Sequence, residues 1–413
     1  MSEANLPDGW NIKKLGNKEV AITKSGGTPN RNKSEYFGGD ILWVKSGELN
    51  DNRIYETEEK LTSLGLQNSS AKVFPPKTLL VALYGATAGK TAVLEVEATT
   101  NQAVCAVFPQ NESFDCSFLQ HQFIYIRPKL LNARSGGAQP NISQTVLSSL
   151  DIVLPPLPEQ RAIARALRAV QEAKAARQKE LALERERKAA LMQHLFTYGT
   201  RGEARKQTEI GEMPESWGIV KLGEVARIVS GGTPERDTPE YWNGDISWVK
   251  TGEINYSTIL KTEESITKEG LDNSSARVIQ TGALLMAMYG QGVTRGRVAI
   301  LGIDAAINQA CAAILLPDDF STEFLFFFLT FSYEKIRLLG HGANQKNLNS
   351  ALIRSIIIPM PSLPEQKEIA TLLTSNDKKL SALQRECEAL DELFRAMLEE
   401  FMTGKLPVQP LLE

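Results

Sequence analysis

Apolar residues recur at alternating steps of four and three along two long stretches of the chain, and this spacing predicts two long helices. The stretches are 158–198 and 364–404, and neither contains Gly or Pro between its first turn and its end. A period of 3.5 residues is typical of a coiled-coil seam. The predicted seam positions are Ile163, Leu167, Val170, Leu181, Leu191 and Leu195 in the first stretch and Ile369, Leu373, Leu380, Leu383, Leu390, Phe394, Met397 and Phe401 in the second.

The charges of the two stretches indicate that they pair with each other. The first has nine basic and five acidic residues, a net +4, and the second has five and nine, a net −4. Since self-pairing would oppose like charges, we expect one antiparallel coiled coil within the chain, roughly 60 Å long. The polar residues Lys174, Arg177, Glu184 and Lys188 weaken the middle of the first seam. Two independent surface helices, each packed on its own domain, are the alternative.

Between these helices the chain shows a mixture of strand and helix signals. Short β-branched or aromatic runs bounded by Gly, Pro or Asn predict strands at 40–44, 78–83 and 103–108, and 147–154 is also strand-like. The segments 118–126 and 324–339 predict buried helices. We therefore expect an α+β fold, with mixed α/β globular domains beside the coiled coil.

An internal repeat spans nearly the whole chain at an offset of 205 to 207 residues. The block Ser25-Gly26-Gly27-Thr28-Pro29 returns at 230–234, the run Glu35–Glu48 at 240–253, and Leu157-Pro158-Glu159-Gln160 at 363–366. Each half is thus one globular domain followed by one helix. The predicted order is a first domain (1–157), a central helix (158–198), a polar linker (199–207), a second domain (208–363), a C-terminal helix (364–404) and a tail (405–413).

Composition places the chain among ordinary globular proteins, with 413 residues, 42% apolar and 23% charged. No apolar run reaches ~18 residues, and Met1–Asn5 lacks the basic and apolar parts of a signal peptide, so we expect a cytoplasmic protein without a membrane partner. Cys105, Cys116, Cys311 and Cys387 show no paired spacing and are expected to be reduced thiols. The three His residues lie in unrelated contexts, so no metal site is expected.

Catalytic motifs are not expected in this chain. The run Gly85–Thr91 resembles a phosphate-binding P-loop, but three residues separate its glycines where the motif needs four. Its counterpart, 290–297, differs in length. An enzyme with a nucleotide site at Lys90 therefore remains only a competing hypothesis. The acidic residues Glu56, Glu58, Glu59, Glu263 and Glu264 are interpreted as solvated.

Two similar domains held apart by a stiff spacer suit the recognition of two DNA half-sites about one helical turn, or ~34 Å, apart. The domains have net charges of 0 and −5, so binding must depend on local loops. Arg suits guanine edges and Asn or Gln suits adenine edges, and residues that differ between the halves are the better candidates for specificity. The candidate DNA contacts are Ser25, Gly26, Gly27, Thr28, Arg31, Lys33, Lys45, Tyr84, Thr87, Lys90, Arg134, Gln139 and Asn141, and in the second half Ser230, Gly231, Gly232, Thr233, Arg236, Lys250, Tyr289, Gln291, Thr294, Arg295, Arg297, Asn344, Gln345, Lys346 and Asn347.

Over residues 6–404 the chain closely resembles the specificity subunit of type I restriction-modification systems. The resemblance rests on the Ser-Gly-Gly-Thr-Pro block, the pairs Gln139/Asn141 and Gln345/Asn347, and the Leu-Pro-Glu-Gln helix entry, each present twice in the same order.

The resemblance implies two target-recognition domains that read a split DNA target across a gap set by helix length. It also implies a chain without catalysis or its own cofactor. Two methyltransferase subunits would use S-adenosylmethionine to methylate adenines, and restriction subunits would add ATP- and Mg-dependent translocation and cleavage. The alternative is a coiled-coil scaffold whose two domains bind proteins.

Overall fold

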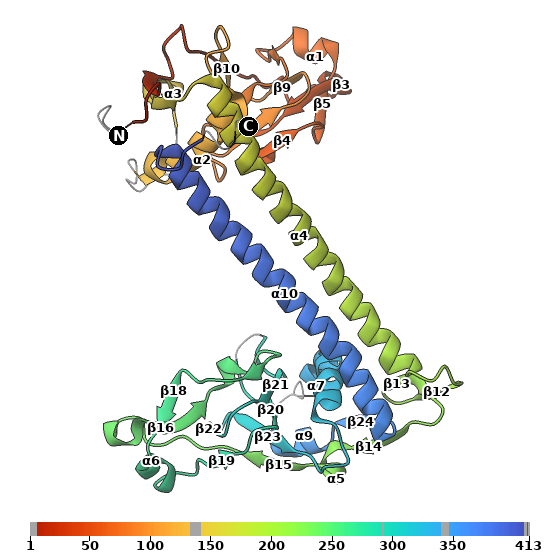
Figure 1. The fold of residues 1–413 in the computed structure, drawn as a ribbon. Coiled ribbons are helices and arrows are strands. Elements are labelled where there is room, and N and C mark those ends of the chain that lie inside the picture. The colour runs from red at the N-terminus through yellow and green to blue at the C-terminus, as the bar shows by residue number, and fades with distance from the viewer. Residues whose placement is uncertain (1–5, 133–141, 291–292, 340–346, 409–410, 412–413) are drawn as a thin grey trace. The chain divides into compact units, whose positions relative to one another are not determined.

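The computed structural model describes residues 6–132, 142–290, 293–339, 347–408 and 411. The chain divides into two units, Met1–Gln178 with Arg385–Glu413, and Lys179–Gln384. Each unit holds one globular domain together with part of helix α4 (Leu157–Tyr198) and part of helix α10 (Leu363–Met402) (Figure 1).

The first domain contains short strands and α-helices. The strands are β1 (Asn11–Lys14), β2 (Ala21–Ser25), β3 (Phe37–Val44), β4 (Asn52–Ile54), β5 (Glu59–Leu61), β6 (Val73–Phe74), β7 (Leu79–Ala82), β8 (Thr91–Leu94), β9 (Ala98–Thr100), β10 (Val104–Pro109) and β11 (Asp151–Leu154), and the helices are α1 (Ser63–Gln67), α2 (Cys116–Asn132) and α3 (Gln144–Ser149). They form a five-stranded sheet β2-β10-β7-β8-β4, a four-stranded sheet β5-β3-β9-β6 and the pair β1-β11.

The five-stranded sheet is buried on both faces. Along β7, Leu79 and Val81 belong to the core that includes Phe123 of α2, whereas Leu80 and Ala82 belong to a second core that includes Val44 of β3. Successive side chains of a strand point to opposite faces, so both faces need apolar residues. This explains why 78–83 is a continuous apolar run, and its prediction as a strand is confirmed.

The second domain repeats this arrangement. Its strands are β14 (Gly218–Lys221), β15 (Arg227–Ser230), β16 (Trp242–Val249), β17 (Thr258–Ile259), β18 (Glu264–Ile266), β19 (Val278–Ile279), β20 (Leu284–Ala287), β21 (Val298–Leu301), β22 (Ala305–Ile307), β23 (Cys311–Leu315) and β24 (Ile357–Met360), and its helices are α5 (Leu222–Val225), α6 (Lys268–Asp272), α7 (Thr322–Phe331), α8 (Tyr333–Leu338) and α9 (Ser350–Arg354). The sheet orders β15-β23-β20-β21-β17 and β18-β16-β22-β19 match those of the first domain strand for strand. The internal repeat is therefore a repeat of topology.

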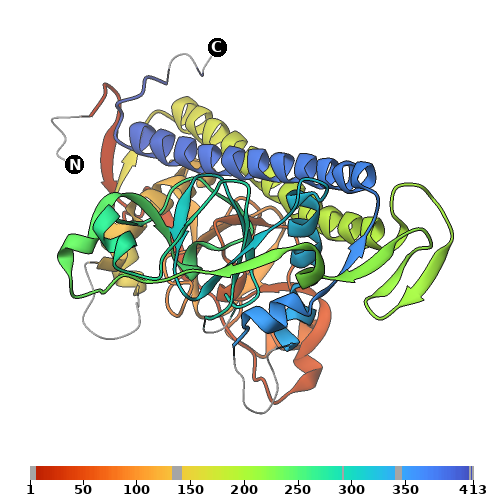
Figure 2. The ribbon, with the colours of Figure 1, turned by 90° about the horizontal axis from the view of Figure 1, so that it is seen from below.

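Within each unit α4 and α10 lie side by side and run antiparallel (Figures 1 and 2). In the first unit Ile163 and Leu167 of α4 share a core with Phe401 of α10 and Trp10. In the second unit Leu195 of α4 shares a core with Ile369 and Leu373 of α10. The predicted fold class, mixed domains with an internal repeat and two long paired helices, is confirmed.

Two local predictions from the sequence differ from the structure. The strand-like segment 147–154 begins inside α3, and only β11 is extended. The expected polar linker 199–207 enters a hairpin of β12 (Arg205–Thr208) and β13 (Gly211–Pro214), whose Met213 is buried. No helix among the described residues combines the length and the apolar character needed to cross a bilayer.

Candidate nucleic-acid interface

The two Ser-Gly-Gly-Thr-Pro blocks lie against buried tryptophans. Trp43 Nε1 donates to the Gly27 carbonyl at 3.1 Å, and Trp248 Nε1 donates to the Gly232 carbonyl at 3.0 Å. A Cβ atom at Gly27 would overlap the backbone of Ser70, so this close approach requires glycine. The hydroxyls in these blocks bond within their own domains, as the pairs Ser25 with Gln144, Thr28 with Gln102, Ser230 with Ser350 and Thr233 with Gln309. These bonds hold the two blocks within their own domains, and DNA contact by the blocks stays a prediction.

Four basic candidates are already paired with carboxylates. Arg31 lies 4.7 Å from the Trp43 ring and pairs with Glu59, which also lies 3.0 Å from Lys45 Nζ. Hydrogen bonds from Arg31 and then Lys45 hold the pKa of Glu59 below its usual range. The expectation that Glu59 is merely solvated is therefore wrong, because it links two cations.

The second domain repeats this network with the same residue types. Arg236 stacks 4.8 Å from the Trp248 ring and pairs with Glu264, whose second partner is Lys250 at 2.8 Å. The pKa of Glu264 is lowered, chiefly by Lys250. The solvated interpretation fails for Glu264 as well. Networks of identical residue types cannot by themselves distinguish two half-sites, and DNA contact by their Arg and Lys residues stays a prediction.

The loops after β7 and β20 present residues that differ between the domains. Each begins with an exposed aromatic residue, Tyr84 at 38% and Tyr289 at 40% exposure. Lys90 Nζ donates to Asn50 at 2.6 Å, and at the equivalent place Arg297 donates to Asn255 at 2.7 Å. A half-exposed Lys in one loop and Arg in the other are the kind of difference that can alter base preference.

The P-loop resemblance of 85–91 has no structural counterpart. Gly89 N and Lys90 N donate to the carbonyls of Ala82 and Thr87, which closes a tight turn, and Thr91 opens β8. A phosphate-binding loop needs a following helix N-terminus, whereas this turn leads into a strand. The hypothesis of a nucleotide site at Lys90 thus loses its geometric basis.

The remaining candidates are exposed or half-buried wherever the structure describes them. Lys33 is exposed, with its Nζ 5.2 Å from the centre of the Tyr36 ring, and a side-chain hydrogen bond with Tyr36 raises its pKa. Thr87 and Thr294 are half-buried, Asn347 is exposed, and Arg295 donates to the Arg337 carbonyl at 3.2 Å. Seven candidates lie outside the described residues, namely Arg134, Gln139, Asn141, Gln291, Asn344, Gln345 and Lys346.

The Leu-Pro-Glu-Gln entries attach each long helix to its own domain, a role that sequence reasoning missed. In the first unit Gln160 accepts from Asp115 N at 2.9 Å and donates to the Pro155 carbonyl at 2.8 Å. In the second unit Gln366 makes the same two bonds, to Ser321 N at 2.9 Å and the Pro361 carbonyl at 3.0 Å. Both glutamines are about 1% exposed. The exact repetition of the Leu-Pro-Glu-Gln tetrapeptide in the two halves could have indicated this structural role from the sequence.

The adjacent glutamates bind a tryptophan in each domain. Trp10 Nε1 donates to Glu159 at 3.0 Å, and Trp217 Nε1 donates to Glu365 at 3.2 Å. Trp10–Gly16 and Trp217–Gly223 are repeated segments, so the domain and its helix are joined identically in the two units. Such a joint fixes the direction in which each helix leaves its domain.

Predicted seam residues lie at the helix contact, and the polar middle of α4 is paired across it. The fully or partly buried seam residues are Ile163, Leu167, Val170, Leu181, Leu191 and Leu195 of α4 and Ile369, Leu373, Leu380, Leu383, Leu390, Phe394, Met397 and Phe401 of α10. In the first unit Lys174 pairs with Asp391, and Arg177 lies 2.9 Å from Glu386. In the second unit Lys188 pairs with Asp377. These ion pairs run between a basic and an acidic helix, as the charges predicted.

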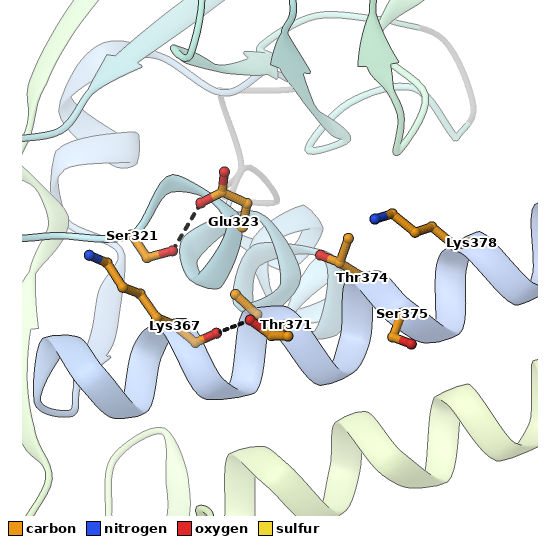
Figure 3. A pocket seen from close by; sticks show the side chains of 8 residues that line it. Ser321, Glu323, Lys367, Thr371, Thr374, Ser375 and Lys378 are labelled. Atoms are coloured by element: carbon orange, nitrogen blue, oxygen red, sulfur yellow. Dashed lines mark hydrogen bonds between the residues drawn. The ribbon is translucent and has the colours of Figure 1, made fainter.

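Pockets lie at equivalent places beside the two helix entries. In the second unit a pocket of about 560 Å³ lies between α10 and the start of α7, where Ser321 is hydrogen-bonded to Glu323 (Figure 3). Its α10 wall presents Lys367, Thr371, Thr374, Ser375 and Lys378. The smaller pocket of the first unit, about 160 Å³, presents Arg161, Arg165 and Arg168 instead. The same site therefore has different surface chemistry in each half.

The thiols of Cys105, Cys116 and Cys311 and the imidazole of His121 are buried, and burial favours the uncharged form of each. Burial raises the pKa of Cys105 and of Cys116 to about 12, and it also raises the pKa of Cys311. His121 is 1% exposed and lies 3.0 Å from Gln171, and burial lowers its pKa. Among the residues with described positions, no cluster of His, Cys, Asp or Glu has a geometry suited to a metal ion.

Comparison with known proteins identifies the family. The model of the type I restriction modification DNA specificity domain matches residues 7–185 and 214–390, one copy in each half. The MjaVIII specificity subunit of Methanocaldococcus jannaschii is 26% identical over 313 residues, which cover 73% of each chain. The MjaIX specificity subunit of the same organism is 22% identical and covers 98% of this chain and 95% of its own.

Solved structures show the same fold. The type I restriction-modification S subunit from M. genitalium has a TM-score of 0.63 at 13% identity, with 97% of both chains covered. A chain from a structural study of type I R-M complex assembly has a TM-score of 0.58 at 20% identity, covering 97% of this chain and 99% of that one. The protein therefore belongs to the type I restriction-modification DNA specificity family, as its repeated motifs indicated.

Proposed function

We propose that this chain is the DNA-recognition subunit of a type I restriction-modification enzyme, and that it reads a bipartite target with one half-site per domain. The observation that carries the proposal is the contrast between framework and loops. Both domains share sheet order, the Trp–Gly contact and the Arg–Glu–Lys network, yet their β7–β8 and β20–β21 loops differ, as Lys90 and Arg297 exemplify. A common framework with different loops suits the reading of two different half-sites.

The two loops would supply base contacts, while affinity would come mainly from partners. The network carboxylates already neutralise Arg31, Lys45, Arg236 and Lys250, so these four cations would contribute little to phosphate binding. Non-specific affinity depends on such cations. We expect the chain to bind DNA weakly alone and tightly within a complex.

Chemistry would be supplied by other subunits. Two methyltransferase subunits would carry S-adenosylmethionine, and restriction subunits would use ATP and Mg, so this chain would be non-catalytic and need no cofactor. The two pockets beside the helix entries are candidate docking points for the methyltransferase subunits. Their equivalent positions in the two halves support one methyltransferase subunit per half. The specificity subunits to which the chain is similar are parts of type I restriction enzymes by name.

Selection from a randomised duplex library tests the proposal. The purified chain, together with its methyltransferase partner, should enrich duplexes with two short motifs at fixed separation. Exchange of residues 84–91 for 289–298 should change one motif and leave the other unchanged. A protein-binding scaffold, the alternative function, predicts no enriched motif in either case.

A further inference from the structure

The loop 84–90 is held at its base by one ion pair from outside the loop. Arg127, near the end of α2, donates to Asp51 Oδ2 at 2.9 Å and to the Gly89 carbonyl at 2.8 Å. Asp51 Oδ1 accepts from the amide of Thr91 at 3.2 Å and from its hydroxyl at 2.9 Å. Gly89 and Thr91 flank Lys90, so the pair grips the chain on both sides of this candidate base contact.

The geometry of the pair makes it a stiff support. The side chains of Arg127 and Asp51 are only 18% and 21% exposed, and both guanidinium Nη atoms bind the carboxylate. Two parallel bonds fix the orientation of the groups as well as their distance. Asp51 has a left-handed backbone, φ 57°, which turns the chain so that neighbouring Asn50 receives Lys90 Nζ. Residues 50 and 51 thus hold the side chain of Lys90 and the loop backbone together.

The second domain uses the same two positions with different chemistry. Tyr256 and Tyr333 stand where the first domain has Asp51 and Arg127, and their rings meet edge to face at 5.8 Å. Tyr256 has the same left-handed backbone, φ 55°, and Arg297 lies 5.6 Å from its ring. The framework tryptophans are identical in both domains, whereas this support changes as a pair, together with the loop residue that it holds.

We propose that Asp51 and Arg127 are positioning residues for specificity in the first domain, with Tyr256 and Tyr333 as their counterparts in the second. The pair sets the position of Lys90 and its loop and thereby the half-site preference of its own domain. This inference rests on the proposed function. A displaced loop would no longer place its side chains for hydrogen bonds to base edges, on which discrimination between bases depends.

The test uses the full chain with its methyltransferase partner and the randomised duplex library. Arg127→Gln removes the support, and Asp51→Asn removes only its charge while keeping an acceptor for Thr91, which guards against a folding failure. Arg53→Gln is the matched control, because Arg53 is similarly buried and binds Glu95 and Ser117 of the same domain instead of residues 84–90. Thermal unfolding of each variant accompanies the selection.

We expect Arg127→Gln to lower the preference for one half-site about tenfold, the loss expected for one base contact, and to leave the other unchanged, with a smaller loss in Asp51→Asn. Arg53→Gln should lower stability and leave both preferences intact. If Arg127→Gln and Asp51→Asn show the same half-site preferences as the unmodified chain, the positioning role is wrong, whereas the proposed function is unaffected. If the unmodified chain selects no split motif, the proposed function itself fails.

Discussion

Asn376 of α10 donates a hydrogen bond of 3.3 Å to the carboxylate of Glu184 on α4, and both side chains are buried in the helix contact of the second unit. Lys379 binds the other carboxylate oxygen at 2.6 Å. A buried polar pair in a coiled coil selects one register and orientation at some cost in stability. The polar middle of α4, which weakens the apolar seam, therefore supplies specific contacts between the helices.

Replacing Glu184 and Asn376 tests how much this buried polar pair costs the coiled coil in stability. Glu184→Ala should lower the thermal unfolding midpoint, because it leaves the buried Asn376 amide without its carboxylate and removes the nearer of the two carboxylates that pair with Lys379, the other being Glu180 at 3.7 Å. Glu184→Leu combined with Asn376→Leu should restore or raise the midpoint, since apolar side chains fit the seam. Glu186→Ala, on the exposed face of α4, should have no effect. A double variant less stable than Glu184→Ala would contradict this view of the seam.

Stability should fall in acid because the network carboxylates are held below their usual pKa. Glu59 is held there by Arg31 and Lys45, and Glu264 by Lys250 and Arg236. The unfolded chain binds protons more readily at these groups. The stabilisation is therefore complete above the unfolded-state pKa of about 4.3 and is lost as pH falls through the lower folded-state values.

Unfolding midpoints measured in a pH series would show this dependence. Combining Glu59→Gln with Glu264→Gln should lower the midpoint at neutral pH and flatten its decline in acid. An equally steep decline in that double variant would mean that other carboxylates control the acid response.

Gln366 should be among the most sensitive positions in the second unit. Gln366→Ala leaves the buried Ser321 amide and Pro361 carbonyl without partners, at a cost of about 1–3 kcal/mol for each group. Gln160→Ala should have a similar effect in the first unit. Exposed Gln178 gives the control. Urea unfolding measures the difference, and a loss below about 0.5 kcal/mol would show that the glutamines do not secure the helix entries.

Shortening the helix pair tests the proposed spacer role. Deleting seven residues from α4 and the seven facing them in α10 keeps the heptad register and removes about 10 Å, or roughly three base pairs. The selected motifs should stay the same while their separation shrinks. Library selection reports both quantities at once. Changed half-site motifs with an unchanged separation would contradict the spacer role of the helix pair.

Regular elements were predictable where burial imposes a pattern on neighbouring residues. The run 78–83 predicted β7 because both faces of its sheet are buried, and the 3.5-residue period predicted α4 and α10. The hairpin β12–β13 was missed because its strands are short and mainly polar. The helix α3 has only six residues, too few to show a helical period.

Contacts between residues distant in the chain were not predictable in the same way. Glu59 lies 28 residues from Arg31, and Asp51 lies 76 residues from Arg127. Nothing local distinguishes such residues from solvated charges. Comparison of the two halves does give a signal, because Asp51 and Arg127 are replaced together by tyrosines.

The most direct test of the central claim is a genome-wide map of methylated adenine in cells that express this chain with its methyltransferase partner. We predict a split motif with a fixed gap, which disappears when this chain is omitted. Methylation that persists without the chain, or that follows one continuous motif, would contradict a bipartite recognition role.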